Sequence, residues 1–123
     1  NKEKSIIYQK SFQFAVKIKS FIKYLSDKNS EFILSKRILR SGTSIAANVR
    51  EALEGQSRRD FISKISIDLK EAAETEYWVE LFLEADLVKK EEVEEILMEI
   101  REIIKILNTI ICSTKKNLSI KTP

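Results

Sequence analysis

Three polar residues, Ser44, Asn48 and Glu51, follow one another at intervals of four and three residues. This spacing places their side chains on one face of a helix. The chain contains no histidine and a single cysteine, which excludes imidazole bases, Ser-His-Asp triads and His- or Cys-based zinc sites within it. Any catalysis would have to depend on carboxylates, lysines or hydroxyls. We interpret the row as side chains that hydrogen-bond across a helix–helix contact.

Carboxylates are the other residues that could do chemistry. Glu51, Glu71 and Glu74 could in principle ligate a metal, but di-iron helical bundles also use histidines, and this chain has none. The chain has only two glycines and no phosphate-binding glycine motif. We therefore expect no catalytic residue, no metal and no cofactor. The expected hydrogen-bond partners of the polar row are Lys70, Glu71, Glu74 and Thr75.

Basic residues are concentrated in the first half of the chain. Residues 1–56 carry 11 basic and 5 acidic side chains, whereas residues 57–123 carry 11 and 14. A surface rich in lysine and arginine attracts nucleic-acid phosphates, although such a distribution also fits docking of basic on acidic faces, or solvated helix surfaces with weak ion pairs. The candidate nucleic-acid-binding residues are Arg40, Arg50, Arg58, Arg59 and Lys64.

Long helices must position these residues, because two glycines and one proline, the last residue, leave the chain almost without breaks. The periodicity of apolar residues predicts one all-α domain over residues 1–123, an antiparallel up-down-up-down four-helix bundle. The predicted helices cover about residues 4–27, 31–55, 58–86 and 90–115, followed by a tail over 117–123.

Apolar and small residues predict how the helices pack. The expected core stripe of the second helix includes Leu39, Gly42, Ala46, Val49 and Leu53, and its small residues would let a partner helix approach closely. We expect Cys112, in an apolar run, to be buried. The aromatic residues Tyr24, Tyr77 and Trp78 widen the apolar faces, which suggests that other subunits cover part of them.

Targeting signals are not evident in the sequence. No apolar stretch approaches the length of a membrane span, and no signal-peptide pattern is present at the amino terminus. With one cysteine, nothing demands an oxidising compartment. We expect a cytoplasmic protein with no membrane contact.

Between about Arg40 and Leu87, three short runs resemble a known family, the four-helix-bundle proteins related to the intervening-sequence protein of bacterial 23S rRNA. The resemblance is also to the accessory variability protein of diversity-generating retroelements. The family resemblance implies a bundle that assembles into a closed homopentamer. The accessory variability protein is a basic pentameric barrel that engages nucleic acid and a reverse transcriptase. Besides Arg40, the matching residues are Ser44, Ile45, Ala47, Asn48 and Glu51 in the first run, Ser57, Arg58, Asp60, Phe61, Ile62 and Lys64 in the second, and Lys70, Glu71, Ala72, Glu74, Thr75, Tyr77 and Trp78 in the third.

Three hypotheses about function follow. We favour a non-enzymatic oligomeric protein whose basic surface contacts RNA or DNA. The alternative is an oligomeric scaffold for a protein partner, such as a reverse transcriptase, without direct nucleic-acid contact. An enzyme that uses paired carboxylates is the third hypothesis, which the missing histidine disfavours.

Overall fold

The computed structural model describes residues 5–28 and 32–121. Within these ranges it contains four α-helices and no strand, which confirms the predicted all-α class. None of the helices has an apolar stretch long enough to cross a membrane. The helices are α1 (Ile6–Lys28), α2 (Phe32–Leu53), α3 (Arg58–Glu84) and α4 (Lys90–Lys121).

The helix bounds lie within two residues of the predicted ones except at the end of α4; α2 and α3 each end two residues earlier than predicted. The predicted starts near residues 4 and 31 lie outside the described residues. Helix α4 continues to Lys121, past the predicted end at 115 and through most of the predicted tail. Residues 90–122 contain no glycine or proline that would interrupt the helix. Residues 122–123 of the predicted tail lie outside the described residues.

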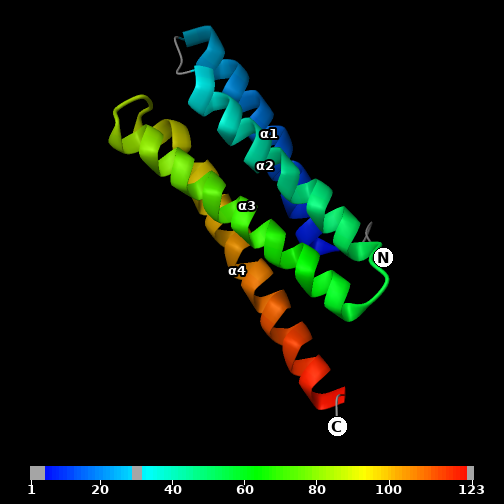
Figure 1. Cartoon of the computed structure of the whole chain (residues 1–123). Coiled ribbons are helices and arrows are strands. Elements are labelled where there is room, and N and C mark those ends of the chain that lie inside the picture. The colour runs from blue at the N-terminus through cyan, green and yellow to red at the C-terminus, as the bar shows by residue number, and fades with distance from the viewer. Residues whose placement is uncertain (1–4, 29–31, 122–123) are drawn as a thin grey trace.

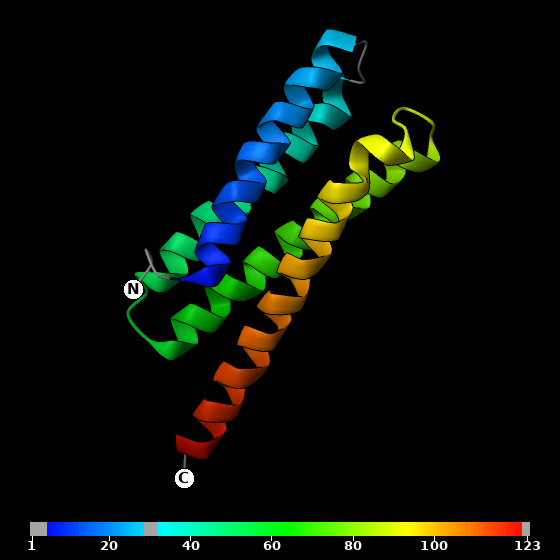
Figure 2. The ribbon, with the colours of Figure 1, turned by 180° about the vertical axis from the view of Figure 1, so that it is seen from behind.

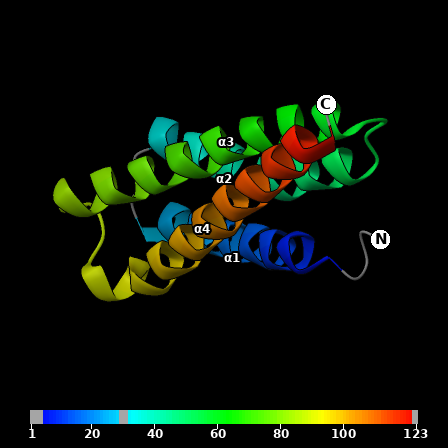
Figure 3. The ribbon, with the colours of Figure 1, turned by 90° about the horizontal axis from the view of Figure 1, so that it is seen from below.

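Helix α1 lies beside α2, and α3 lies beside α4 (Figure 1; Figure 2, from behind). Helix α2 packs on α1 and α3, and α4 packs on α3 and, less extensively, on α1. The view from below shows α4 crossing obliquely between α1 and α3 (Figure 3). The connection between α2 and α3 and the connection between α3 and α4 lie at opposite ends of the bundle (Figure 1).

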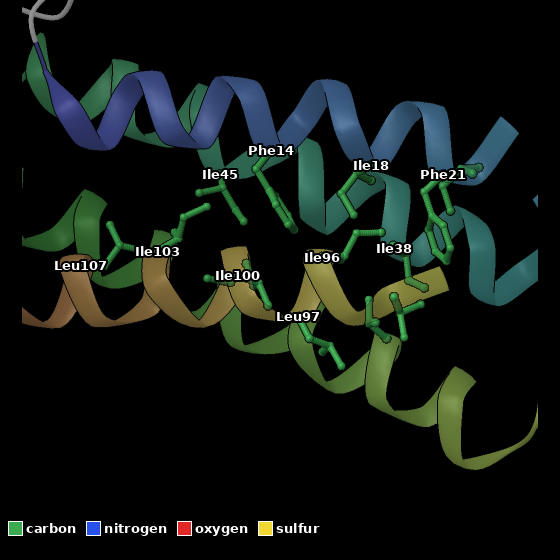
Figure 4. Packing of buried hydrophobic residues seen from close by; sticks show 14 of the residues in the cluster. Phe14, Ile18, Phe21, Ile38, Ile45, Ile96, Leu97, Ile100, Ile103 and Leu107 are labelled. Atoms are coloured by element: carbon green, nitrogen blue, oxygen red, sulfur yellow. The ribbon is translucent and has the colours of Figure 1, made fainter. Parts of the chain in front are cut away.

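One hydrophobic core runs along the inside of the four helices (Figure 4). Burial of these large aliphatic and aromatic side chains is the main stabilising contribution, about 25 cal/mol per Å² of apolar surface removed from water. In α2, Gly42, Ala46 and Val49 of the predicted stripe are buried, whereas Leu39 and Leu53 are only half-buried. Ile38 and Ile45, which the predicted stripe omitted, are completely buried. The largest fully buried side chains are Phe14, Phe82, Ile18, Ile38, Ile45, Ile65, Ile100, Ile103, Leu107, Val49, Val79 and Val93.

The far end of α4 extends beyond the other helices (Figure 1). Leu107 is the last buried residue of α4 among those whose side chains are described. Cys112 is exposed, so the expectation that it is buried is wrong. The apolar run around Cys112 has no helix to cover it completely, because the bundle ends before this segment does.

Ion pairs join α1 to α4 on the outside of the core. Lys17 pairs with Glu95 at 2.6 Å and with Glu99, and Lys10 pairs with Glu102. Part of the charge asymmetry between the two halves of the chain is thus neutralised within one molecule. Lys10 and Lys17 are therefore less available to an external anion than the sequence alone suggested.

Helix α3 is followed by a residue with a left-handed backbone conformation. Asp86 has φ 60°; its N–H donates to the Leu83 carbonyl at 3.1 Å and the Leu87 N–H donates to the Phe82 carbonyl at 3.0 Å. This pair of bonds is a Schellman motif, in which glycine is the preferred residue at the left-handed position. Side chains with a Cβ are strained in this region of φ.

Asp86→Gly is therefore expected to raise the free energy of unfolding by about 1 kcal/mol, because glycine adopts this φ without strain. Chemical denaturation followed by circular dichroism would measure the change. The control is Ala73→Gly, at an exposed position in the middle of α3, which should instead destabilise the protein by about 1 kcal/mol. Equal effects of the two substitutions would contradict the prediction.

Candidate functional site

Polar side chains from α2 and α3 meet along the contact between these two helices, and we call this set the polar seam. Along α2 the seam extends from Arg40 to Asn48. Arg40 and Ser41 contact the later part of α3, at Glu74 and Thr75, and Asn48 contacts the earlier part, at Asp68. Residues buried between two helices are usually apolar. Each polar residue of the seam therefore needs a hydrogen-bond or ion-pair partner, or its polar group stays unsatisfied. The polar seam consists of Arg40, Ser41, Ser44, Asn48, Asp68, Glu71, Glu74 and Thr75.

The predicted polar row faces α3. The Ser44 hydroxyl lies 3.1 Å from Glu71 Oε2 and 2.9 Å from the Ser41 carbonyl oxygen, so Glu71 is a partner as expected. Asn48 is half-buried and lies beside Asp68. Glu51 is exposed, and its nearest ion-pair partner is Lys64 at 3.8 Å.

A buried pair of hydroxyls, missed by the sequence analysis on the α2 side, joins the helices at the centre of the seam. Thr75 Oγ1 lies 2.8 Å from Ser41 Oγ, and both residues are completely buried. The Thr75 hydroxyl also lies 2.9 Å from the Glu71 carbonyl oxygen within α3. Ser41 precedes Ser44 by three residues, and this helical spacing is the signal that could have found it.

Arg40 closes the outer side of the seam. Its guanidinium lies 3.3 Å from Glu71 Oε2 and 3.0 Å from Glu74 Oε2. The negative charge of Glu71 raises the pKa of Arg40, and Glu74 also accepts a hydrogen bond from Trp78 Nε1 at 3.2 Å. Arg40 is thus a cross-helix ion-pair residue as well as a surface cation.

Asp68 is the least satisfied member of the seam. Its side chain is completely buried, and neither carboxylate oxygen has a hydrogen-bond partner of good geometry. Burial raises the pKa of Asp68 to about 8; the neighbouring Glu71 carboxylate adds to the rise and the Asn48 amide opposes it. The carboxyl group is therefore largely protonated at neutral pH. Sequence analysis did not select Asp68, because an aspartate in an amphipathic helix is usually solvated.

The remaining candidate cations gather at one end of the bundle. Arg50 is in the last turn of α2, and Arg58 and Arg59 begin α3, on either side of the short connection over residues 54–57 (Figure 1). All three are exposed, and none forms an ion pair with a described residue. We call these three residues the arginine end.

The polar seam connects α2 and α3 through side-chain contacts. Its contacts are hydrogen bonds and ion pairs between fixed helices, and among the described residues no group of three or more histidine, cysteine or acidic side chains could hold a metal ion. The arrangement can fix the register of α2 on α3 and can present cations to an external partner.

Trp78 is partly buried and Tyr77 exposed; their rings are 5.0 Å apart, edge to face.

Comparison with known families agrees with these motifs. A family model described as 23S rRNA-intervening sequence protein matches residues 3–109. The chain belongs to this family. The resemblance to this family that the sequence motifs indicated is thereby confirmed, and the match extends beyond the motifs to α1 and most of α4. No curated protein matches the chain significantly.

A solved structure also supports membership of the 23S rRNA-intervening sequence protein family. It is the crystal structure of a protein of unknown function from the S23 ribosomal protein family from Bacteroides thetaiotaomicron. The two chains are 50% identical, and the match covers 86% of this chain and 98% of the other with a TM-score of 0.83. The two proteins therefore share the four-helix fold. The function of the related protein is unknown, so the comparison assigns no function to this chain.

Proposed function

We propose that this chain is a non-enzymatic cytoplasmic protein that assembles antiparallel four-helix bundles into a closed homopentamer and binds the phosphates of RNA or DNA. The observation that carries the proposal is the arginine end: Arg50, Arg58 and Arg59 are exposed, close in the fold and without ion-pair partners among the described residues. A ring of such subunits would repeat this basic end around its axis.

The electrostatics of the arginine end favour an anion. Two of its arginines occupy the first turn of α3, where the partial positive charge of the helix terminus adds to their own. Arginine suits phosphate well because its planar guanidinium donates two parallel hydrogen bonds. Glu51, Glu54 and Asp60 lie in the same region, so the attraction is local rather than spread over the whole end.

Arg40 and Lys64, the other two candidate residues, contribute less in this proposal. Arg40 is held by Glu71 and Glu74 across the seam, and Lys64 lies within 3.8 Å of Glu51. A phosphate would have to compete with carboxylates already in contact with these cations. We expect their substitution to weaken nucleic-acid binding less than substitution of the arginine end.

The test is nucleic-acid affinity as a function of salt concentration. The parent chain should bind single- and double-stranded RNA and DNA more weakly as salt rises, with log Kd linear in log salt concentration. The triple variant Arg50→Gln, Arg58→Gln, Arg59→Gln should reduce the slope by about 3, one for each lost phosphate contact. Fluorescence anisotropy of labelled oligonucleotides measures both quantities.

The matched control removes three charges elsewhere, by Lys105→Gln, Lys115→Gln and Lys116→Gln on α4, where all three residues are exposed. This variant has the same net charge as the triple arginine variant and should keep nearly the parent slope. No measurable binding by the parent at low salt would overturn the proposal. An equal loss of slope in both variants would show that net charge alone, and not the arginine end, attracts the nucleic acid.

A second candidate function, an oligomeric scaffold for a protein such as a reverse transcriptase, is favoured by the outer face of α1. Phe12 and Val16, one helical turn apart, are 53% and 56% exposed, and the Tyr8 ring lies 6.1 Å from that of Phe12. Exposed apolar side chains grouped in this way mark protein-binding surfaces. A specific partner retained after nuclease treatment, and lost in Phe12→Asp with Val16→Asp, would support this candidate over the first.

A further inference from the structure

Two surfaces at the same end of the bundle complement each other in charge, and each exposes an apolar side chain. One is a groove between α3 and α4, with an open volume of about 1190 Å³. The other is the first part of the outer face of α2. The groove is lined by Glu80, Leu83, Glu84, Lys90, Glu94, Leu97, Met98 and Arg101, and the α2 patch consists of Ile33, Lys36, Arg37 and Arg40.

The groove has an apolar floor and a charged rim of three acidic and two basic side chains. Met98 is 62% exposed, and Leu83 is half-buried beside it in the lining. Arg101 is already paired with Glu76 at 2.8 Å and with Glu80 at 3.3 Å. Two further acids of the lining remain without an ion pair to any described residue, namely Glu84 and Glu94.

The α2 patch has the opposite character. Ile33 is 64% exposed and is surrounded by cations. The Arg37 guanidinium lies over the Trp78 ring, 5.5 Å from its centroid, which holds this charge at the surface in a defined place. An exposed isoleucine flanked by Lys36 and Arg37 matches an apolar groove flanked by two carboxylates.

We propose that the α3–α4 groove of one subunit receives the α2 patch of a second copy of this chain, with Ile33 in the groove and with Lys36 and Arg37 facing Glu84 and Glu94. The contact is heterologous, because two different surfaces meet. This inference deepens the oligomeric part of the proposed function and depends on it.

Position along the bundle indicates that such contacts close into a ring. The start of α2 lies at the same end of the bundle as the turn between α3 and α4 (Figures 1 and 2). The two surfaces belong to different faces, since α2 packs on α1 and α3 whereas the groove is formed by α3 and α4. Subunits can therefore meet by rotation about an axis along the bundle without a shift along it, and heterologous contacts without such a shift form rings rather than filaments.

Charge reversal tests the contact. We expect the parent chain to have the solution mass of an oligomer by light scattering. Lys36→Glu with Arg37→Glu should reduce the mass to that of a single chain, because four carboxylates would then face one another. Glu84→Lys with Glu94→Lys should do the same, and the variant with all four reversals should regain the parent mass because the complementarity is restored.

Controls separate this inference from the proposed function. Lys115→Glu with Lys116→Glu makes the same change of charge at exposed positions of α4 outside the groove and should keep the parent mass. Ile33→Asp should dissociate the oligomer without altering Glu84 or Glu94. An oligomeric parent whose mass survives every reversal would overturn the contact alone. A monomeric parent would overturn both the contact and the pentamer, while salt-dependent nucleic-acid binding is scored separately.

Discussion

Asp68→Asn is expected to stabilise the protein at neutral and alkaline pH and to remove most of the pH dependence of stability between about pH 4 and pH 8. Asp68 is completely buried without a hydrogen-bond partner of good geometry, and burial raises its pKa from 3.8 to about 8. Asparagine has nearly the same shape and needs no proton to remain neutral. Its amide can also donate a hydrogen bond.

The direction in which stability changes with pH follows from proton binding by Asp68. Between pH 4 and 8 the unfolded chain has an ionised Asp68, whereas the folded protein keeps it protonated, so folding takes up a proton. The stability contributed by this group is complete below the unfolded pKa and falls as pH rises, by roughly 1.4 kcal/mol per pH unit, until the folded pKa is reached. At pH 7 the cost of retaining Asp68 is on the order of 4 kcal/mol. Asp68→Asn should recover about 2 kcal/mol or more of it.

Urea denaturation at several pH values measures this effect. The parent should lose stability between about pH 5 and pH 8, and Asp68→Asn should show a flatter profile that crosses above it. Asp27→Asn changes an exposed carboxylate on α1 in the same way and should keep the parent profile. A parent whose stability rises over this range, or an Asp68→Asn variant with the parent's slope, would show that Asp68 is ionised in the folded protein.

Gly42→Val is expected to destabilise the protein by about 3 kcal/mol, because it overpacks the contact between α1 and α2. A Cβ at Gly42 would lie 3.1 Å from both Cγ1 and Cγ2 of Ile18. Ile18 is completely buried in the core, so it cannot move away without displacing its own neighbours. The close approach predicted for the small residues of α2 is confirmed at this position.

A double-mutant cycle tests this mechanism. Ile18→Ala removes the two contacting atoms and alone should cost 2 to 5 kcal/mol, yet Gly42→Val in that background should cost much less than in the parent. Gly42→Ala should have a small net effect, since about 1 kcal/mol of helix propensity offsets the tight contact. Ala47→Val places the same side chain on the exposed face of α2 and should cost less than 1 kcal/mol. Additive effects of the substitutions at 18 and 42 would refute the proposed contact.

Helical periodicity was sufficient to predict some features of the site. Ser44 and Glu71 were expected to meet across two helices, and they do. Because residues three and four apart share a helix face, the spacing of Ser44, Asn48 and Glu51 already defined the side of α2 that meets α3. The same rule could have added Ser41, whose hydroxyl partner Thr75 was among the expected partners.

Other features depend on how far each helix is rotated and how far it extends. Leu39 and Ile38 are neighbours in the sequence, and only packing decided that Ile38 is completely buried. Asp68 and Asp60 cannot be distinguished by residue type, but one is buried and the other is not. Cys112 is exposed because α4 extends beyond the bundle (Figure 2).

The sequence by itself determined the all-α class, the four helices and the family, because local periodicity, scarce breakers and short motifs are properties of consecutive residues. The tertiary structure alone decided which charges are already satisfied. Arg40 and Lys64 are held by carboxylates from another helix, whereas Arg50, Arg58 and Arg59 are not. Ion pairing depends on distances between residues far apart in the chain, and these distances exist only once the helices have packed.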